Sequence, residues 1–336
     1  MNINGLIGNT PMIKIKANYD GKIVNVFAKL EYYNYTGSIK DRLAYYVIQE
    51  SYKDGSLKKG MPIVEATSGN TGISFAAIGA YFGHEVHIFM PEWASRERIA
   101  IMKLYGAHVY LVSKEDGGFK EAIRRADILA EEINGFRPNQ FDNIKNVEAH
   151  YNTTGLEIVN SVSNIDLFVS GIGTGGTLMG IAKRVKEINK NVKIVALEPM
   201  QMPIMSKGIS GTIHRIEGIG DDFIPSIVDR DIIDEVIMID DADALNMSRK
   251  LALKFGLGVG ISSGANLLAA IIFAKDNDNV VTVFADDFKK YLTTDLIKEL
   301  DDSNHLLSNK IVIESIEFVN WCNKKILIFF SIFLCL

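Results

Sequence analysis

The chain has 336 residues, of which 47% are hydrophobic and 23% are charged. This balance is typical of a globular protein, and the length favours two domains of ordinary size over a single small core. The formal net charge is −5 and no basic run interrupts the sequence, which argues against nucleic acid or an anionic membrane as the main partner.

Only two cysteines occur, Cys322 and Cys335, and both lie close to the C-terminal end. The body of the chain therefore has neither a disulfide framework nor a thiolate metal site. The first residues also lack the basic start and apolar run of a signal peptide. Without such a site we expect no bound metal. We expect a cytoplasmic protein, because a reducing compartment fits this cysteine usage.

Apolar stretches typical of strands alternate with amphipathic helical segments. The stretches predicted as strands are 23–30, 84–90, 107–112, 165–170, 192–197 and 280–284. Apolar spacing predicts a helix over 119–133, ended by Asn134-Gly135, and further helices over 43–48 and from about residue 147. This alternation predicts an α/β fold with parallel sheets between helical layers, a three-layer αβα arrangement.

A polar stretch at 143–146 marks the weak boundary between two predicted domains, 1–145 and 146–300. Residues 301–336 form an atypical tail that ends in the apolar run 326–336. As a helix this run would be about 16 Å long, roughly half the hydrocarbon thickness, so it cannot cross a membrane alone. Two readings stay open: it contacts a membrane together with 318–323, or it is not native to the protein.

The segment Tyr35–Arg42 places Lys40 in the first turn of a predicted helix, after a strand and a turn of Gly and Ser. The positive end of the helix dipole disfavours an ammonium group there and lowers its pKa. A lysine that is easily made neutral forms Schiff bases with carbonyl compounds. A lone lysine is more commonly a solvated surface residue, so this interpretation depends on the other motifs.

Two further glycine-rich turns connect a strand to a helix. In 65–72, hydroxyls and free N–H groups suit a carboxylate, although for this turn alone a simple Thr/Ser helix cap is the stronger explanation. In 171–177, successive glycines let the backbone approach a phosphate. Together with Glu198, the second turn also matches a dinucleotide fingerprint, which keeps an NAD-dependent dehydrogenase as an alternative.

A third turn, 260–264, matches the Gly-x-Ser-x-Gly nucleophile elbow of hydrolases. That elbow requires a later histidine, and the only one after Ser262 is His305, beyond the last predicted core strand. The hydrolase interpretation is therefore weak. A serine that starts a helix can instead hydrogen-bond a heteroaromatic nitrogen.

These motifs, preceded by 5–11 (Gly-Leu-Ile-Gly-Asn-Thr-Pro), resemble in order the β family of pyridoxal-phosphate enzymes, the group of cysteine synthase and cystathionine β-synthase. The resemblance covers residues 5 to about 298 and implies a tryptophan-synthase-β-like fold with the cofactor in the cleft between the domains. We expect the first 35 or so residues to pack on the C-terminal domain. Lys40 would be the Schiff-base lysine.

The resemblance also implies how cofactor and substrate are held. Asn70 would bond the ring hydroxyl, and Ser262 would face the pyridine nitrogen. The phosphate would be cradled by Gly173, Thr174, Gly175, Gly176 and Thr177. The substrate carboxylate would be held by Thr67, Ser68, Gly69, Thr71 and Gln140.

A neutral serine at the ring nitrogen weakens the ring as an electron sink, which suits elimination of a β-leaving group over transamination. Lys40 would then remove the α-proton. The implied reaction is β-replacement on cysteine, O-acetylserine or serine, with cysteine synthase activity as the first expectation. Cystathionine β-synthase activity, and attack by water or a thiol with release of hydrogen sulfide, are alternatives. A homodimer is expected, and a catalytically inactive family member is the non-enzymatic rival.

The stretch 217–225 looks more like the cystathionine β-synthase branch. We expect Gly218, Ile219 and Gly220 beside the substrate. Asp221 or Asp222 could be a base for water, turning cysteine into serine and sulfide, although both aspartates could equally flank a solvated loop. Departures from the family pattern at Tyr35-Thr36 and over 285–290 leave the second substrate open.

Overall fold

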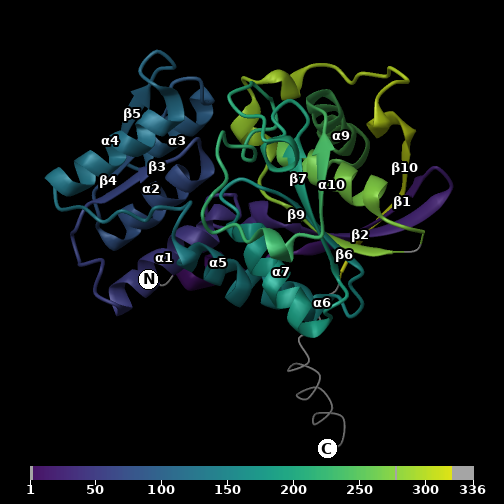
Figure 1. Cartoon of the computed structure of the whole chain (residues 1–336), viewed down its shortest axis with the longest axis horizontal. Helices are drawn as coiled ribbons and strands as arrows, with labels where there is room; N and C mark the ends of the chain where they lie inside the picture. The colour runs from purple at the N-terminus through teal and green to yellow at the C-terminus, as the bar shows by residue number, and fades with distance from the viewer. Residues whose placement is uncertain (1–2, 277, 320–336) are drawn as a thin grey trace, which may run out of the picture.

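Two β-sheets organise the protein, shown in Figure 1 from a computed structural model that describes residues 3–276 and 278–319. The large sheet has the strand order β10-β1-β2-β9-β6-β7-β8, and the small sheet has the order β3-β4-β5. The strands are β1 Met12–Tyr19, β2 Lys22–Leu30, β3 Ile63–Ala66, β4 Val86–Pro91, β5 His108–Val112, β6 Leu167–Gly171, β7 Lys193–Pro199, β8 Glu235–Ile239, β9 Asn279–Phe284 and β10 Ile311–Phe318.

Helices follow most of the strands. They are α1 Lys40–Lys53, α2 Asn70–Phe82, α3 Arg96–Leu104, α4 Gly118–Glu132, α5 Ile144–His150, α6 Leu156–Ser161, α7 Gly176–Ile188, α8 Ile204–Lys207, α9 Asp241–Phe255 and α10 Ile261–Phe273, with a π-helical turn at Tyr151–Gly155. Every strand predicted from the sequence is present within a few residues. The helix predicted over 119–133 is α4, and Asn134 after it has a positive φ. The sequence patterns did not point to β1, β8 or β10.

Helices pack on both faces of the inner strands of each sheet, which confirms the predicted αβα layers. Alternate residues of β6 point to opposite sides: Leu167 and Val169 share a core with α9 and α10, whereas Phe168 belongs to a core with α7. In the small sheet, Ile88 packs with α1 and α2, and its neighbour Phe89 packs with α4. Because such strands are buried on both faces, they read as continuous apolar runs in the sequence.

The N-terminal strands belong to the large sheet, since β2 pairs parallel with β9 and antiparallel with β1. The chain then passes to α1 and the small sheet before it returns at β6 (Figure 1). The domain ranges 1–145 and 146–300 stay a prediction.

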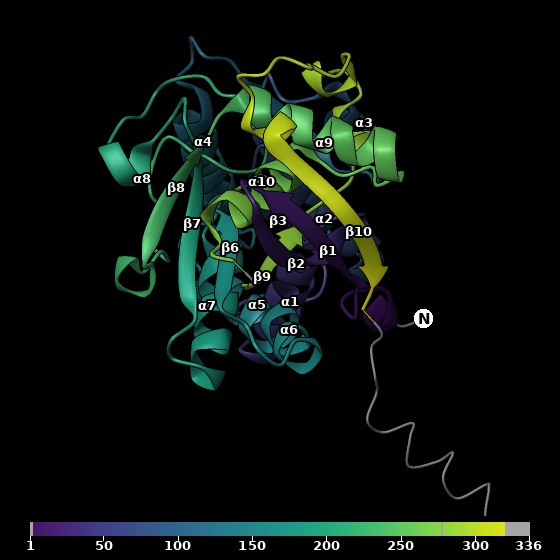
Figure 2. The same ribbon diagram turned by 90° about the vertical axis from the view of Figure 1, so that its right-hand side faces the viewer.

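The structure corrects our interpretation of the tail. Strand β10 pairs antiparallel with β1 from Ile13↔Phe318 to Tyr19↔Ile311, and Ile311 is buried (Figure 2). Residues 311–318 are therefore part of the sheet, and a cut after Asn309 would remove a strand from it.

The apolar run 326–336 and both cysteines lie outside the described residues. Among 3–276 and 278–319, no helix has the length and apolar character needed to cross a membrane.

A buried network of charges joins the start of α1 to the large sheet. Arg42 donates to both oxygens of Glu31 at 2.6 and 2.9 Å, and to both oxygens of Glu157 at 2.6 and 2.8 Å. Lys29 completes the group through an ion pair with Glu157 at 2.6 Å and a hydrogen bond to the hydroxyl of Thr10 at 2.6 Å. The network thus connects α1 with β2, α6 and the N-terminal segment.

Within this network the cations keep the carboxylates ionised. Burial opposes the charge on Glu31, but Arg42 and Lys29 outweigh it and lower the pKa of Glu31 to about 2. The stabilisation from this lowered pKa is therefore complete above the ordinary glutamate pKa, and it is lost as the pH falls towards 2.

We predict that Arg42→Leu lowers the free energy of unfolding by about 3–5 kcal/mol, because it leaves two buried carboxylates without their main partner. Urea denaturation followed by circular dichroism measures this change. The control is Arg124→Leu, since Arg124 makes only an exposed ion pair with Glu121 on α4. Equal unfolding midpoints for the two variants would show that the network does not stabilise the fold.

Candidate active site

Lys40, the first residue of α1, is held against the large sheet by its neighbours. The backbone N–H of Ile39 donates to the carbonyl of Ala285 at 2.9 Å, and Ser38 forms an isolated bridge with Asp286. Both contacts lie just beyond the carboxyl end of β9. Open α/β sheets bind ligands at this edge, and the sequence-predicted lysine is therefore placed there.

Two small cavities, of about 30 and 60 Å³, meet at this edge. They share Lys40, Gly173, Thr174, Gly218, Ile219, Ser262 and Ala285, so they form one pocket. The smaller cavity reaches Gly175 and Thr177 on the turn before α7. The larger one reaches the 67–71 turn, Gln140 and Asp221. The structure thus brings together residues that are more than 200 positions apart in the chain.

Three of the predicted site residues do not line this pocket. Gly176 packs against Asn146, where a Cβ would collide with the amide of that side chain. Gly220 and Asp222 line a wider outer cleft of about 670 Å³, which also includes Gly218, Ile219 and Asp221. This cleft shares Ser68 and Arg98 with the inner pocket, so the two are adjacent.

The turn that enters α7 is built to accept an anion. Gly175 has a φ of +87°, which favours glycine. A Cβ at Gly173 would lie 2.6 Å from the carbonyl oxygen of Gly218, so only glycine fits between the two loops. The first N–H groups of a helix have no intrahelical partner, and here they surround a pocket lined by the side chains of Thr174 and Thr177.

Burial is the main cause of the lowered pKa of Lys40, while the carboxylates of Asp286 and Asp221 act in the opposite direction. The helix dipole, from which the sequence predicts a lowered pKa, gives the same direction but is not the main cause. A lysine whose ammonium form is disfavoured can act as a nucleophile or a base near neutral pH.

Asn70 presents an unsatisfied acceptor at the same pocket. Its Nδ2 donates to Oδ2 of Asp286 at 2.7 Å, whereas its Oδ1 is buried and has no hydrogen-bond partner among the described residues. Tyr291 also donates to Oδ2 of Asp286, at 2.5 Å. A buried acceptor of this kind requires a donor, such as a ligand hydroxyl.

Arg98 is a residue of this site that the sequence analysis missed. Its guanidinium lies behind Gly69, donates to the carbonyl of Ser68 at 3.3 Å and forms an ion pair with Glu217. It stacks on the ring of Tyr291 at 4.7 Å, and its Nε and Nη2 are buried without a hydrogen-bond partner among the described residues. A signal existed, because Arg98 is a cation in the first turn of α3, the same unfavourable placement that singled out Lys40.

The two adjacent aspartates have different environments. Burial, together with the charge of the neighbouring Asp222, raises the pKa of Asp221 to about 7, although Lys40 opposes the shift. Asp222 lines only the outer cleft and forms an ion pair with Lys120 at 3.3 Å. Asp221 is therefore the carboxyl group that can exchange a proton inside the pocket near neutral pH.

The structure does not support the dehydrogenase and hydrolase alternatives, because the residues on which they depend are not available for those roles. The carboxylate of Glu198 accepts hydrogen bonds from the backbone N–H groups of Met205 and Ser206, at 2.7 and 3.1 Å, and is therefore occupied in capping α8. It cannot also bind a ribose, which removes the basis of the dehydrogenase alternative. Among the described residues that line the inner pocket, none is a histidine, so Ser262 lacks the base that a hydrolase needs.

Comparison with known proteins agrees with this geometry. The sequence model of a family described as pyridoxal-phosphate dependent enzymes matches residues 3–286. The chain belongs to this family. Its cofactor is therefore pyridoxal 5′-phosphate, and the resemblance stated from the motifs is confirmed.

Several relatives are similar over nearly their whole length. Cysteine synthase B of Campylobacter jejuni is 44% identical over 88% of this chain and 97% of its own. A cysteine synthase of Staphylococcus aureus is 41% identical over 88% and 96%. A hydrogen sulfide-producing enzyme of Fusobacterium nucleatum has a TM-score of 0.89 and 48% identity, over 94% and 98%. An Asp→Asn variant of the latter enzyme has been solved with an α-aminoacrylate intermediate.

The residues in the pocket fit this cofactor. The Gly173–Thr177 turn offers backbone N–H groups at the start of α7 to a phosphate, and Lys40 offers an amine to an aldehyde. Oδ1 of Asn70, which has no partner among the described residues, can accept from a ring hydroxyl. Ser262 lines both cavities and can meet a ring nitrogen there. These individual roles stay predictions.

We predict that Lys40→Ala abolishes turnover, because one substitution removes both the amine that binds the aldehyde and the base for the α-proton. The variant should still take up pyridoxal phosphate through the Gly173–Thr177 turn, but borohydride should no longer attach the cofactor covalently. Mass spectrometry after reduction measures the attachment. Lys289→Ala is the control, since the Lys289 side chain is 72% exposed. Substantial turnover by Lys40→Ala would contradict the assignment.

Proposed function

We propose that this enzyme exchanges the group on the β-carbon of a small amino acid, with O-acetylserine and sulfide as the first substrate pair. The observation that carries the proposal is one pocket that joins a lysine of lowered pKa, a phosphate-type turn and an uncharged serine to a loop suited to a carboxylate. The two bacterial relatives named above as cysteine synthases support a reaction that forms cysteine.

The loop before α2 is held in a shape that suits a substrate carboxylate. Thr71 donates to Oε1 of Gln140 at 2.6 Å, and Gln140 in turn donates to the carbonyl of Ala66 at 2.8 Å. The N–H of Gly69 donates to the hydroxyl of Thr67 at 3.1 Å. Arg98, behind the loop, adds positive charge at the N-terminus of a 13-residue helix, and both favour an anion there.

Lys40 lines the same cavity as this loop, which supports a role for it in moving the α-proton of an amino acid whose carboxylate lies on the loop. Bound pyridoxal phosphate would supply an electron sink that acidifies the α-carbon. A neutral Lys40 amine can then accept the proton. Ser262, which carries no charge, would leave the ring nitrogen largely unprotonated, and this favours loss of a β-substituent over transamination.

Asp221 favours a second candidate, replacement of the thiol of cysteine by water, which yields serine and hydrogen sulfide. Its carboxylate would repel an anionic acceptor such as HS⁻, but it can take a proton from a neutral acceptor such as water or a thiol. The hydrogen sulfide-producing relative, 48% identical, supports this candidate. A homocysteine thiol as acceptor would correspond to cystathionine β-synthase activity.

Product analysis of the purified enzyme tests the proposal. We expect cysteine from O-acetylserine plus sulfide, and we expect serine plus sulfide from cysteine alone. Cystathionine from cysteine or O-acetylserine plus homocysteine would instead identify a thiol acceptor. An enzyme that carries the cofactor but gives none of these products would contradict β-replacement.

We predict that Asp221→Asn slows serine formation from cysteine by roughly a hundredfold or more, because the shape is kept and only the base is lost. In the wild type this rate should fall about tenfold per pH unit below about 7, since Asp221 is then protonated. Asp222→Asn should have a smaller effect and should move this fall to lower pH, because it removes the charge that raises the pKa of Asp221. Steady-state serine assays from pH 5 to 9 measure both changes.

An unchanged rate of serine formation in Asp221→Asn would argue against water activated by Asp221 as the acceptor. If Asp221→Asn makes serine at the wild-type rate and keeps the wild-type pH profile, water is not activated by this carboxylate. In that case O-acetylserine plus sulfide remains the substrate pair to test. A build-up of a new long-wavelength absorbance in the variant would support the role of Asp221 in the second half-reaction.

Two further expectations, a cytoplasmic location and a homodimer, accompany the proposal. A cytoplasmic location is supported by the absence of cysteines from residues 1–321. A homodimer is expected on the basis of the sequence. Fractionation and light scattering would test these two expectations respectively.

A further inference from the structure

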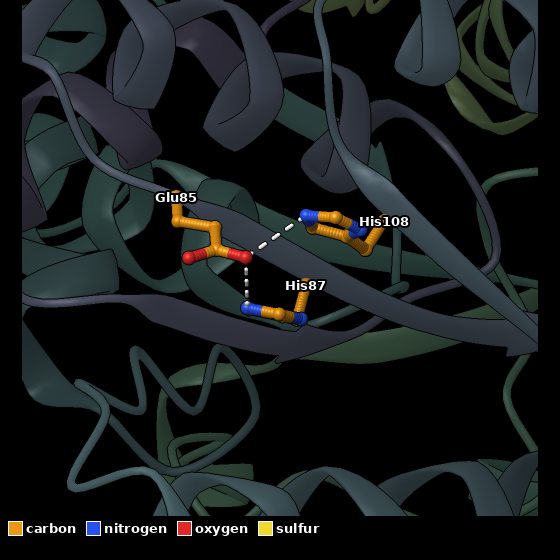
Figure 3. Close-up of side chains that lie close together, drawn as sticks. All are labelled: Glu85, His87 and His108. Carbon is orange, nitrogen blue, oxygen red and sulfur yellow. Dashed lines mark ion pairs between the residues drawn. The ribbon is translucent and has the colours of Figure 1, made fainter.

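We propose that Glu85, His87 and His108 form a binding site for a divalent transition metal ion, Zn²⁺, on one face of the small sheet (Figure 3). None of these residues is among the described residues that line the active-site pocket or its outer cleft. The proposal is therefore independent of the proposed function.

Strand register brings the three side chains together. β4 and β5 are parallel neighbours, and His87 pairs directly with His108. Glu85 precedes His87 by two residues, and the period of two along an extended chain places both on the same face. The two imidazole rings stack with centroids 4.8 Å apart and planes 16° apart.

The donor atoms converge on one point. Oε1 of Glu85 lies 3.4 Å from Nε2 of His87 and 2.9 Å from Nε2 of His108, and all three donor atoms lie within 4.8 Å of one another. Tetrahedral Zn²⁺ with bonds of about 2.0–2.1 Å holds its ligand atoms roughly 3.3 Å apart. Small rotations of the exposed His108 and Glu85 side chains are enough to reach this geometry.

The surroundings of His87 favour metal binding. Its Nδ1 lies 3.1 Å from the hydroxyl of Tyr110, an outer partner that orients the ring with Nε2 towards Glu85. Tyr110 is itself held by stacking on Phe89 at 4.6 Å. The His87 residue is only 8% exposed, so one ligand is fixed in place while the other two are reachable from solvent.

The donor set selects the class of ion. Two imidazoles and one carboxylate suit Zn²⁺ and similar ions, whereas Mg²⁺ and Ca²⁺ prefer oxygen ligands alone. Three protein ligands leave the remaining coordination to water. The site lies at the amino ends of β4 and β5, opposite the edge that carries the 67–71 turn, so the ion would tie the edge strand β5 to β4 and would not take part in catalysis.

Isothermal titration of the full-length holoenzyme with ZnCl₂, without cysteine or other thiols, tests the proposal. We expect one site per chain with micromolar or tighter affinity, at least tenfold weaker in His108→Gln and in Glu85→Gln. The matched control, His305→Gln, removes an exposed histidine elsewhere and should bind as the wild type does. A double Cys322→Ser, Cys335→Ser variant should also keep the site.

A second readout separates metal binding from loss of structure. Zn²⁺ should raise the unfolding temperature of the wild type, and this rise should be absent from His108→Gln, whose cysteine synthase turnover should stay unchanged. The proposal is overturned if the wild type does not bind Zn²⁺ at micromolar concentration. It is equally overturned if His108→Gln and Glu85→Gln bind Zn²⁺ as the wild type does.

Discussion

The position of the active site depends on the buried charges around Arg42. Arg42 lies two residues after Lys40, and its guanidinium is shared by Glu31 beside β2 and Glu157 on α6. Withdrawing these charges from water is costly, so the network is stable only when all partners are in place. The start of α1 is therefore held in one position against the large sheet, and Lys40 with it. The buried ion pairs of Arg42 thus hold Lys40 in position, although Arg42 does not line the pocket.

Much of the site could be predicted because its signals are local. A glycine-rich turn before a helix, as in 171–177, indicates both a tight backbone turn and an anion-binding site. The placement of Lys40 in a first helical turn identified an unusual lysine, although burial proved to be the main cause of its lowered pKa. Continuous apolar runs likewise indicated buried parallel strands such as β4 and β6, which are covered on both faces.

The features that sequence reasoning could not provide arise from long-range packing. Asp221 and Asp222 are neighbours in the chain, yet only Asp221 enters the inner pocket, and no local pattern distinguishes them. Arg98 has a local signal in its placement in the first turn of α3, but its contact with Glu217 on a distant loop depends on packing. The cysteine count argued against a thiolate metal site, but Glu85, His87 and His108 become a possible metal site only through the register of β4 and β5. Strand β10 was missed because its pairing partner lies about 300 residues away.

The pairing of β10 with β1 also protects the protein from aggregation through the edge of β1. Without β10, β1 would present an unpaired row of backbone N–H and C=O groups beside Ile13 and Ile15, and such edges recruit strands from other molecules. β10 covers that row and is itself the outer strand of the sheet among the described residues. Its edge is less favourable for pairing, because it carries Glu314 and Glu317 and has a register irregularity opposite Lys16 and Ala17. The strand thereby limits aggregation while adding nothing to the chemistry of the pocket.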